Sequence, residues 1–173
     1  MPFAPPRFVR ADIDRATAGL VVPLVYRGRD QTFTVPGGFV TDFASVPRFL
    51  TWLVPTMGTY TRAAIVHDWL CTQLETLHRL HGNPNAAPAS ARDTDGVFRR
   101  IMREEGVPLA RRWLIWCGVR WGAVANPARR AGWWRDAPAV LGISLLAAPV
   151  VVPAGLLVIL ALLVDQAVEA MTP

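Results

Sequence analysis

The sequence predicts an α+β fold, with a small β-hairpin or sheet followed by about three packed helices and a C-terminal transmembrane helix. Two short β-branched runs lie within residues 20–35 of the 173-residue chain. Helical periodicity and helix-capping residues dominate residues 59–121. Residues 137–164 carry no charged side chain and are numerous enough to cross a bilayer. We therefore expect a small folded domain tethered to a membrane.

The β part is predicted from two runs joined by a turn. Residues 20–26 and 31–35 are rich in valine, threonine and aromatic residues, and Gly28 lies between them. This pattern is typical of a hairpin, and Pro23 favours an edge strand. Two glycines then interrupt the strand before it resumes at residues 39–41. Residues 1–18 are proline-rich without clear periodicity, so an irregular segment is expected there.

Three helices are predicted after the strands. Apolar residues recur at helical spacing from Thr59 or Thr61 to about Leu80. The next helix spans residues 94–105 with Ser90 or Asp93 as its cap. Its expected apolar stripe is Val97, Phe98, Ile101 and Met102. The third helix spans residues 109–121, with core positions expected at Trp113, Trp116, Cys117 and Trp121.

The apolar run at residues 137–164 has three interpretations. Pro149 and Pro153 each remove a backbone donor near its middle, which favours a single kinked span. A re-entrant hairpin and buried helices of a soluble or virion assembly remain open. Arginines precede the run and acidic residues follow it, so the positive-inside rule predicts a cytoplasmic N-terminal domain in the host cell. The first residues contain no apolar signal segment, which agrees with that orientation.

The chain is thereby divided into five expected segments. An irregular segment at 1–18 precedes an α+β domain at 19–123, which is followed by an Arg- and Trp-rich juxtamembrane linker at 124–136. The membrane segment at 137–164 and a short acidic tail at 165–173 complete it.

The charge of the chain comes from arginine alone. All 18 basic residues are Arg, against 13 acidic residues. No dense basic run with interleaved exposed aromatics occurs, so no specific nucleic-acid binding is expected. Cys71 and Cys117 have neither CxxC nor zinc-finger spacing, which indicates reduced core thiols.

Several polar residues interrupt otherwise apolar stretches. Asp42, Asp68 and Asp95 lie in such places, and a buried carboxylate costs several kcal/mol unless it is paired. Adjacent helical residues project about 100° apart, so His67 and Asp68 cannot simply pair with each other. The available partners are Arg48, Arg62, His67 and Arg120.

Four motifs resemble one known family. They are VPGGFVTDFASVPR at 35–48, YTRAAIVHDWL at 60–70, DGVF at 95–98 and WCGVRWG at 116–122. Together they resemble the domain-of-unknown-function family 1353 over about residues 20–123, a family found widely in bacteriophages and prophages. The resemblance implies characteristic polar positions at Asp42, Ser45, Arg48, His67, Asp68 and Asp95. It supplies no reaction, and the apolar tail is an addition to what many relatives contain.

Two chemical interpretations of the polar residues follow. A divalent metal could be held by Asp42, His67 and Asp95, with Asp68 as an alternative ligand and Ser45 and Arg48 in support. The chain would then be a metal-assisted hydrolase acting at the cell envelope during lysis or entry. Alternatively, the same groups are ordinary caps, turns and paired core residues.

The expected function is that of a phage or prophage structural or morphogenesis protein, for instance a tail-associated one. Its apolar segment would contact the lipid bilayer and the rest other phage proteins, in the host membrane or in a virion. The hydrolase is the alternative, because a cytoplasmic domain cannot reach the cell wall directly. A membrane lysis accessory is a weaker alternative.

Overall fold

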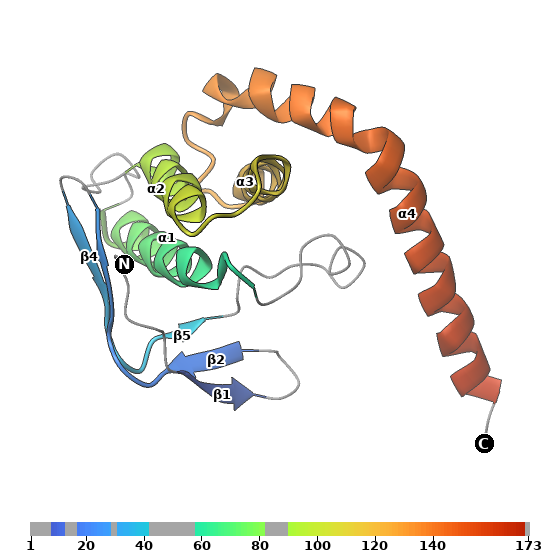
Figure 1. Cartoon of the computed structure of the whole chain (residues 1–173), viewed down its shortest axis with the longest axis horizontal. Coiled ribbons are helices and arrows are strands. Elements are labelled where there is room, and N and C mark those ends of the chain that lie inside the picture. Colours follow the sequence, from blue (N-terminus) through green and yellow to red (C-terminus); the bar gives the residue numbers. More distant parts are fainter. Residues whose placement is uncertain (1–7, 13–16, 29–30, 42–57, 82–89, 172–173) are drawn as a thin grey trace.

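The computed structural model describes residues 8–12, 17–28, 31–41, 58–81 and 90–171 (Figure 1). Strands come first, followed by helices, and α+β is the class observed. The strands are β1 (Phe8–Asp12), β2 (Thr17–Leu20), β3 (Leu24–Arg27), β4 (Thr32–Val35) and β5 (Val40–Thr41). The helices are α1 (Thr61–His81), α2 (Ala91–Glu104), α3 (Leu109–Val124), the short 3-10 turn η3 (Trp133–Arg135) and α4 (Ala137–Met171).

The strands form two small antiparallel sheets. Strands β3 and β4 are the predicted hairpin, and Leu24 pairs with Val35 in its register. The second sheet has the order β1-β2-β5 and was only partly expected. The prediction of an irregular segment at residues 1–18 is wrong where β1 and β2 form, since β2 pairs with both β1 and β5. The pairing of β2 with β5 joins residues that are distant in the sequence, such as Ala18 and Thr41, and local periodicity does not reveal it.

Helix ends agree with the capping signals. Ser90 caps α2 by accepting a hydrogen bond from the backbone N–H of Asp93, and the Asp93 side chain accepts one from the Ser90 backbone in return. This reciprocal pair satisfies two backbone donors that the first helical turn leaves open. Gly106 follows the end of α2 with φ +77°, a left-handed conformation that glycine adopts without a Cβ penalty.

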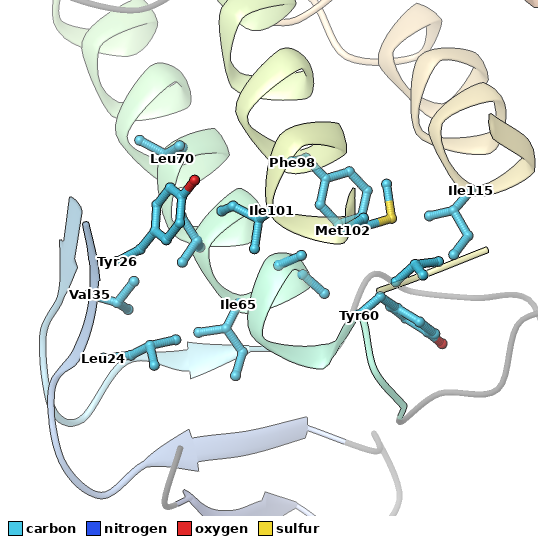
Figure 2. Packing of buried hydrophobic residues seen from close by; sticks show 14 of the residues in the cluster. Leu24, Tyr26, Val35, Tyr60, Ile65, Leu70, Phe98, Ile101, Met102 and Ile115 are labelled. Carbon is cyan, nitrogen blue, oxygen red and sulfur yellow. The ribbon is translucent and has the colours of Figure 1, made fainter. Parts of the chain in front are cut away.

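The main core lies between the β3–β4 hairpin and helices α1 and α2. Figure 2 shows Leu24, Tyr26 and Val35 from the hairpin facing Ile65 of α1. From α2, Phe98, Ile101 and Met102 of the predicted stripe are fully buried, whereas its fourth member, Val97, is only partly buried. A second cluster contains Trp116 and Cys117 of α3 together with Val140 of α4. Trp121 is 45 % exposed, so its predicted core position is wrong.

Helix α4 is one continuous 35-residue helix that is bent midway (Figure 1). Pro149 and Pro153 lie inside it, which accounts for the bend because each proline removes a backbone hydrogen bond. A hairpin of two helices therefore does not form. At 1.5 Å per residue the helix is about 52 Å long, more than the roughly 30 Å of a bilayer core. It is long and apolar enough to cross a membrane, and little of it is buried against the rest of the protein.

The start of α4 packs against α3. Val140 is fully buried, the Val140 carbonyl accepts a hydrogen bond from Cys117 Sγ at 3.5 Å, and Trp121 Nε1 donates to Ser144 Oγ at 3.0 Å. The first turns of the apolar helix thus belong to the folded domain. The segment before α4 also contacts the domain, because Trp133 Nε1 donates a hydrogen bond to the Arg120 carbonyl of α3 at 2.7 Å.

Candidate functional site

A buried ion pair joins α1 to α2. His67 Nε2 lies 2.7 Å from Asp95 Oδ1, and the two residues are 6 % and 1 % exposed. His67 is on the inward face of α1, where its ring also packs on Phe98 with centroids 4.6 Å apart. Asp95 is in the second turn of α2, between Thr94 and Gly96, and faces inward because Phe98 and Met102 continue the same buried side. The histidine and the carboxylate therefore meet inside the core.

Arg120 and Asp136 extend this pair into a chain of charges. Arg120 of α3 is 0 % exposed, and its Nη1 donates to Asp95 Oδ2 at 2.8 Å. Arg120 Nη2 lies 3.2 Å from Asp136 Oδ2, and Asp136 is the residue immediately before α4. Arg92 Nε donates to the other Asp136 oxygen at 3.0 Å. We call the four buried residues His67, Asp95, Arg120 and Asp136 the charge relay core.

The charge relay core holds Asp95 ionised and His67 protonated. Burial alone would lower the pKa of His67, but the neighbouring Cys71 side chain and the ion pair with Asp95 outweigh it and raise the pKa to about 9. Burial opposes ionisation of Asp95, yet hydrogen bonds from His67 and Arg120 and the nearby Arg129 lower its pKa. His67 is consequently an imidazolium at neutral pH, and both of its ring nitrogens carry protons.

Cys71 lies next to His67, one helical turn later. Its Sγ is 3.6 Å from Nε2 and 3.8 Å from Nδ1 of the imidazole. A sulfur in line with the Nδ1–H bond would be much farther from Nε2 than from Nδ1, so these nearly equal distances place the sulfur off both N–H axes. The geometry is that of a thiol packed beside a ring. Both cysteines are free and buried, which confirms the expected core thiols.

The structure brings together only some of the predicted site residues. His67 and Asp95 are brought together, and Arg120 is their partner, as the requirement for a buried counter-charge predicted. Asp68 is half-buried on the neighbouring face of α1. Arg62, another expected partner, binds Glu105 at 2.7 Å instead. Asp42, Ser45 and Arg48 lie outside the described residues.

The charge relay core does not have the composition of a metal site. Among the described ranges, no three His, Cys, Asp or Glu side chains gather closely enough to hold an ion. Both Asp95 oxygens face cations at hydrogen-bond distance. A protonated imidazole has no lone pair to donate to a metal. In this structure the two proposed metal ligands, His67 and Asp95, are thus hydrogen-bonded to each other.

Asp136 is the member that sequence reasoning missed. It lies in an Arg-rich stretch that was assigned to a linker, and nothing local distinguishes it from a surface acid. The available signal was that Arg120 needs more than one carboxylate to satisfy a buried guanidinium.

A basic groove lies beside the charge relay core. It is open, has a volume of about 1050 Å³, and runs between α2, α3 and the start of α4. Six arginines line it, namely Arg92, Arg99, Arg100, Arg103, Arg112 and Arg135. Trp113, Trp116 and Asp136 lie along it as well. The arginines come from three separate elements, which explains why no basic run was visible in the sequence.

Comparisons with known proteins give a family and no activity. A family model described as protein of unknown function (DUF1353) matches residues 18–119, more than half of the chain. The match contains α1, α2 and most of α3, and with them two of the four members of the charge relay core, His67 and Asp95; Arg120 is the residue directly after its end. No curated protein and no solved structure matches.

Proposed function

The chain belongs to the DUF1353 family, and we propose that it is a membrane-anchored structural protein of a bacteriophage or prophage rather than an enzyme. The single observation that carries this proposal is the charge relay core. Its charges are paired with one another inside the protein, and the chain of contacts runs from α1 to the residue before the apolar helix. Such an arrangement joins the domain to the base of its anchor.

The phage setting rests on the family resemblance of the four motifs. Within that setting a structural or morphogenesis role, such as a tail-associated one, requires a rigid module and a means of attachment. The core supplies the first, because a buried charge network is stable in one arrangement only when every partner is in place. Helix α4 supplies the second through its length and apolar surface.

The orientation of the anchor follows from charge. Arg129, Arg130 and Arg135 precede α4, whereas Asp165 and Glu169 are near its end. We infer that the folded domain is on the cytoplasmic side of the host membrane, since arginine-rich flanks are retained there. Trp134, with 71 % of its surface exposed directly before the helix, suits the interface between headgroups and water.

A truncation tests the anchoring. A chain ending at Ala148 keeps the contacts of Val140 and Ser144 with α3 but lacks the rest of α4. We expect the full chain to stay in the membrane fraction after washing with alkaline carbonate, and the shortened chain to be released. Equal release of both would contradict a membrane span. In inside-out vesicles, added protease should digest the N-terminal domain and leave the C-terminal residues protected. Protection of the N-terminal domain instead would show the opposite orientation.

The metal-assisted hydrolase remains the second candidate, with Asp42, His67, Asp68 and Asp95 as its residues. One observation favours it: the imidazole of His67 is hydrogen-bonded to the buried carboxylate of Asp95, a pair that also occurs in catalytic sites. Metal analysis of the purified full chain and of His67→Gln and Asp42→Ala variants separates the candidates. Stoichiometric metal in the full chain, lost from both variants, would support the hydrolase. Equal metal content in the three proteins, with lower stability of His67→Gln, supports the structural role.

A further inference from the structure

We propose that the basic groove binds the phosphate headgroup of an anionic phospholipid. This inference rests on the proposed membrane anchoring, since it assigns a ligand to the surface at the base of the anchor. The chemistry required is a phosphate mono- or diester, because guanidinium groups bind phosphate oxygens in pairs through planar, two-pronged hydrogen bonds.

Among the described residues that line it, the groove carries an excess of positive charge. Its acids are Asp93 and Asp136, against six arginines. Asp93 is used by the cap of α2, and Asp136 by Arg92 and Arg120. For Arg99, Arg103 and Arg112, no carboxylate partner occurs within the part of the chain that the structure describes. An anion from outside is the missing partner.

Arg99 is held in position for such an anion. Its guanidinium lies 4.5 Å from the ring centre of Trp113 and 5.3 Å from that of Trp116, and those two rings meet edge to face. Burial lowers the pKa of Arg99, Asp136 opposes the shift, and the nearby Arg112, Arg103 and Arg92 lower it further. The cation is therefore fixed on an aromatic surface within an uncompensated positive field, which reduces the ordering cost of binding.

The arginines on α2 form a row. Arg92, Arg99 and Arg103 are spaced by seven and four residues and so lie along one face of the helix. Gly96 is between them, and a Cβ added there would meet no atom within 4 Å. The row thus flanks an open space rather than a filled one. Arg112 of α3 faces the same groove from the neighbouring helix.

The position of the groove selects a lipid over a soluble anion. Arg135, Asp136 and Ala139 line it, and Ala139 is already within α4. Arg135 also packs over the exposed Trp134 at 5.5 Å. The groove is therefore continuous with the base of the apolar helix, where phospholipid headgroups are at high local concentration. Basic pockets beside membrane helices on the cytoplasmic side are typical sites for anionic headgroups.

The lining suits an amphipathic ligand. Besides the arginines, the groove contains the partly buried side chains of Phe33, Val97 and Trp113. A phosphate would lie on the arginine row, and the glycerol backbone against these apolar atoms. A phosphatidylglycerol molecule offers both parts, whereas phosphatidylcholine has the same glycerol but a headgroup without net charge.

Lipid binding to the full chain in a non-ionic detergent tests the proposal. Phosphatidylglycerol and phosphatidylcholine with identical acyl chains are titrated, and the bound lipids are counted by native mass spectrometry. The test variant is Arg103→Gln/Arg112→Gln, which leaves Arg99 on its tryptophans. The control is Arg79→Gln/Arg111→Gln, which removes the same charge from exposed positions outside the groove. Unfolding midpoints by tryptophan fluorescence establish that each variant is folded.

We expect the wild type to prefer phosphatidylglycerol and the groove variant to bind it about 30-fold more weakly. The figure follows because each arginine near an anionic lipid surface contributes roughly a factor of five in affinity. The control should keep the wild-type affinity. An unchanged groove variant, or an equal loss in the control, overturns the site.

Two further arms identify the source of the phosphate. Inorganic pyrophosphate and a single-stranded oligonucleotide are each offered without lipid and then against bound phosphatidylglycerol. Tighter binding of either one than of the lipid, with the same loss in the groove variant, overturns the lipid assignment. Release of the full chain from membranes by carbonate would instead overturn the anchoring while leaving the detergent titration interpretable.

Discussion

Replacing Asp95 by asparagine is the sharpest test of the charge relay core. Asparagine has nearly the same shape as aspartate, so packing beside Phe98 is preserved while the negative charge is lost. Arg120 and His67 then lose their shared partner at 2.8 and 2.7 Å. Because Arg120 is 0 % exposed, water cannot take the place of the carboxylate.

The magnitude follows from what remains in place. Breaking a buried ion pair by removing one partner costs about 3–5 kcal/mol. Asp136 still lies 3.2 Å from Arg120 and keeps part of the compensation, so the low end of that range, about 3 kcal/mol, is expected. Domains of this size have free energies of unfolding of about 5–15 kcal/mol. The variant should therefore fold, but with a markedly lower stability.

Urea unfolding of the full chain in mild detergent, followed by tryptophan fluorescence, measures the effect. With a slope of about 1–3 kcal/mol per molar urea, the midpoint should fall by about 1–3 M. Asp165→Asn is the matched control, because it makes the same chemical change at an exposed position on α4. A midpoint for Asp95→Asn as close to wild type as that of the control refutes a structural role for the network. Such a result would be expected if Asp95 served catalysis in a cleft and not the stability of the fold.

Three other outcomes are expected. The pKa of His67 is raised from 6.5 to about 9, so its protonation contributes about 3 kcal/mol to the free energy of unfolding. This contribution is complete below pH 6.5 and is lost as pH rises through 9, and the urea midpoints of wild type and His67→Gln should therefore converge at high pH. Val140→Ala should lower the free energy of unfolding by about 2 kcal/mol in the same assay, whereas Leu146→Ala, at a position 83 % exposed, should leave it unchanged. Ser90→Ala should cost about 1 kcal/mol through loss of the α2 cap, measured as the shift in thermal unfolding by circular dichroism.

Each of these outcomes has a clear contrary result. Parallel wild-type and His67→Gln curves between pH 6.5 and 9 would mean that the imidazole is not charged in the folded state. Equal effects of Val140→Ala and Leu146→Ala would mean that the start of α4 does not pack on α3. An unaffected thermal midpoint in Ser90→Ala would mean that the reciprocal cap contributes nothing to α2.

Local signals in the sequence predicted the elements well. The β3–β4 hairpin and the helices α1, α2 and α3 follow from alternation, helical periodicity and caps, which depend on neighbouring residues only. Strands β1 and β2 were missed because residues 1–18 show no clear alternation, and β2 also depends on pairing with the distant β5, which local patterns do not encode. The class α+β was correct because helices and strands segregate along the chain.

The site was predicted in part. The cost of burying Asp95 unpaired correctly indicated His67 and Arg120 as partners, since that reasoning depends on charge and not on coordinates. Asp136 and the basic groove were not foreseen. Their arginines and acids become neighbours only after α2, α3 and the start of α4 pack together, and each segment by itself resembles a solvated helix face.

The packing of Val140 and Ser144 on α3 has a mechanical consequence. If α4 anchors the chain in a membrane, as proposed, the domain is held against the first turns of that helix and cannot swivel freely above the lipid surface. The freedom that remains is concentrated at Pro149 and Pro153, where backbone hydrogen bonds are missing. Bending at these two prolines would turn the domain and the start of α4 as one body, so that in the proposed anchored state the same face of the domain would always point in one direction relative to the membrane.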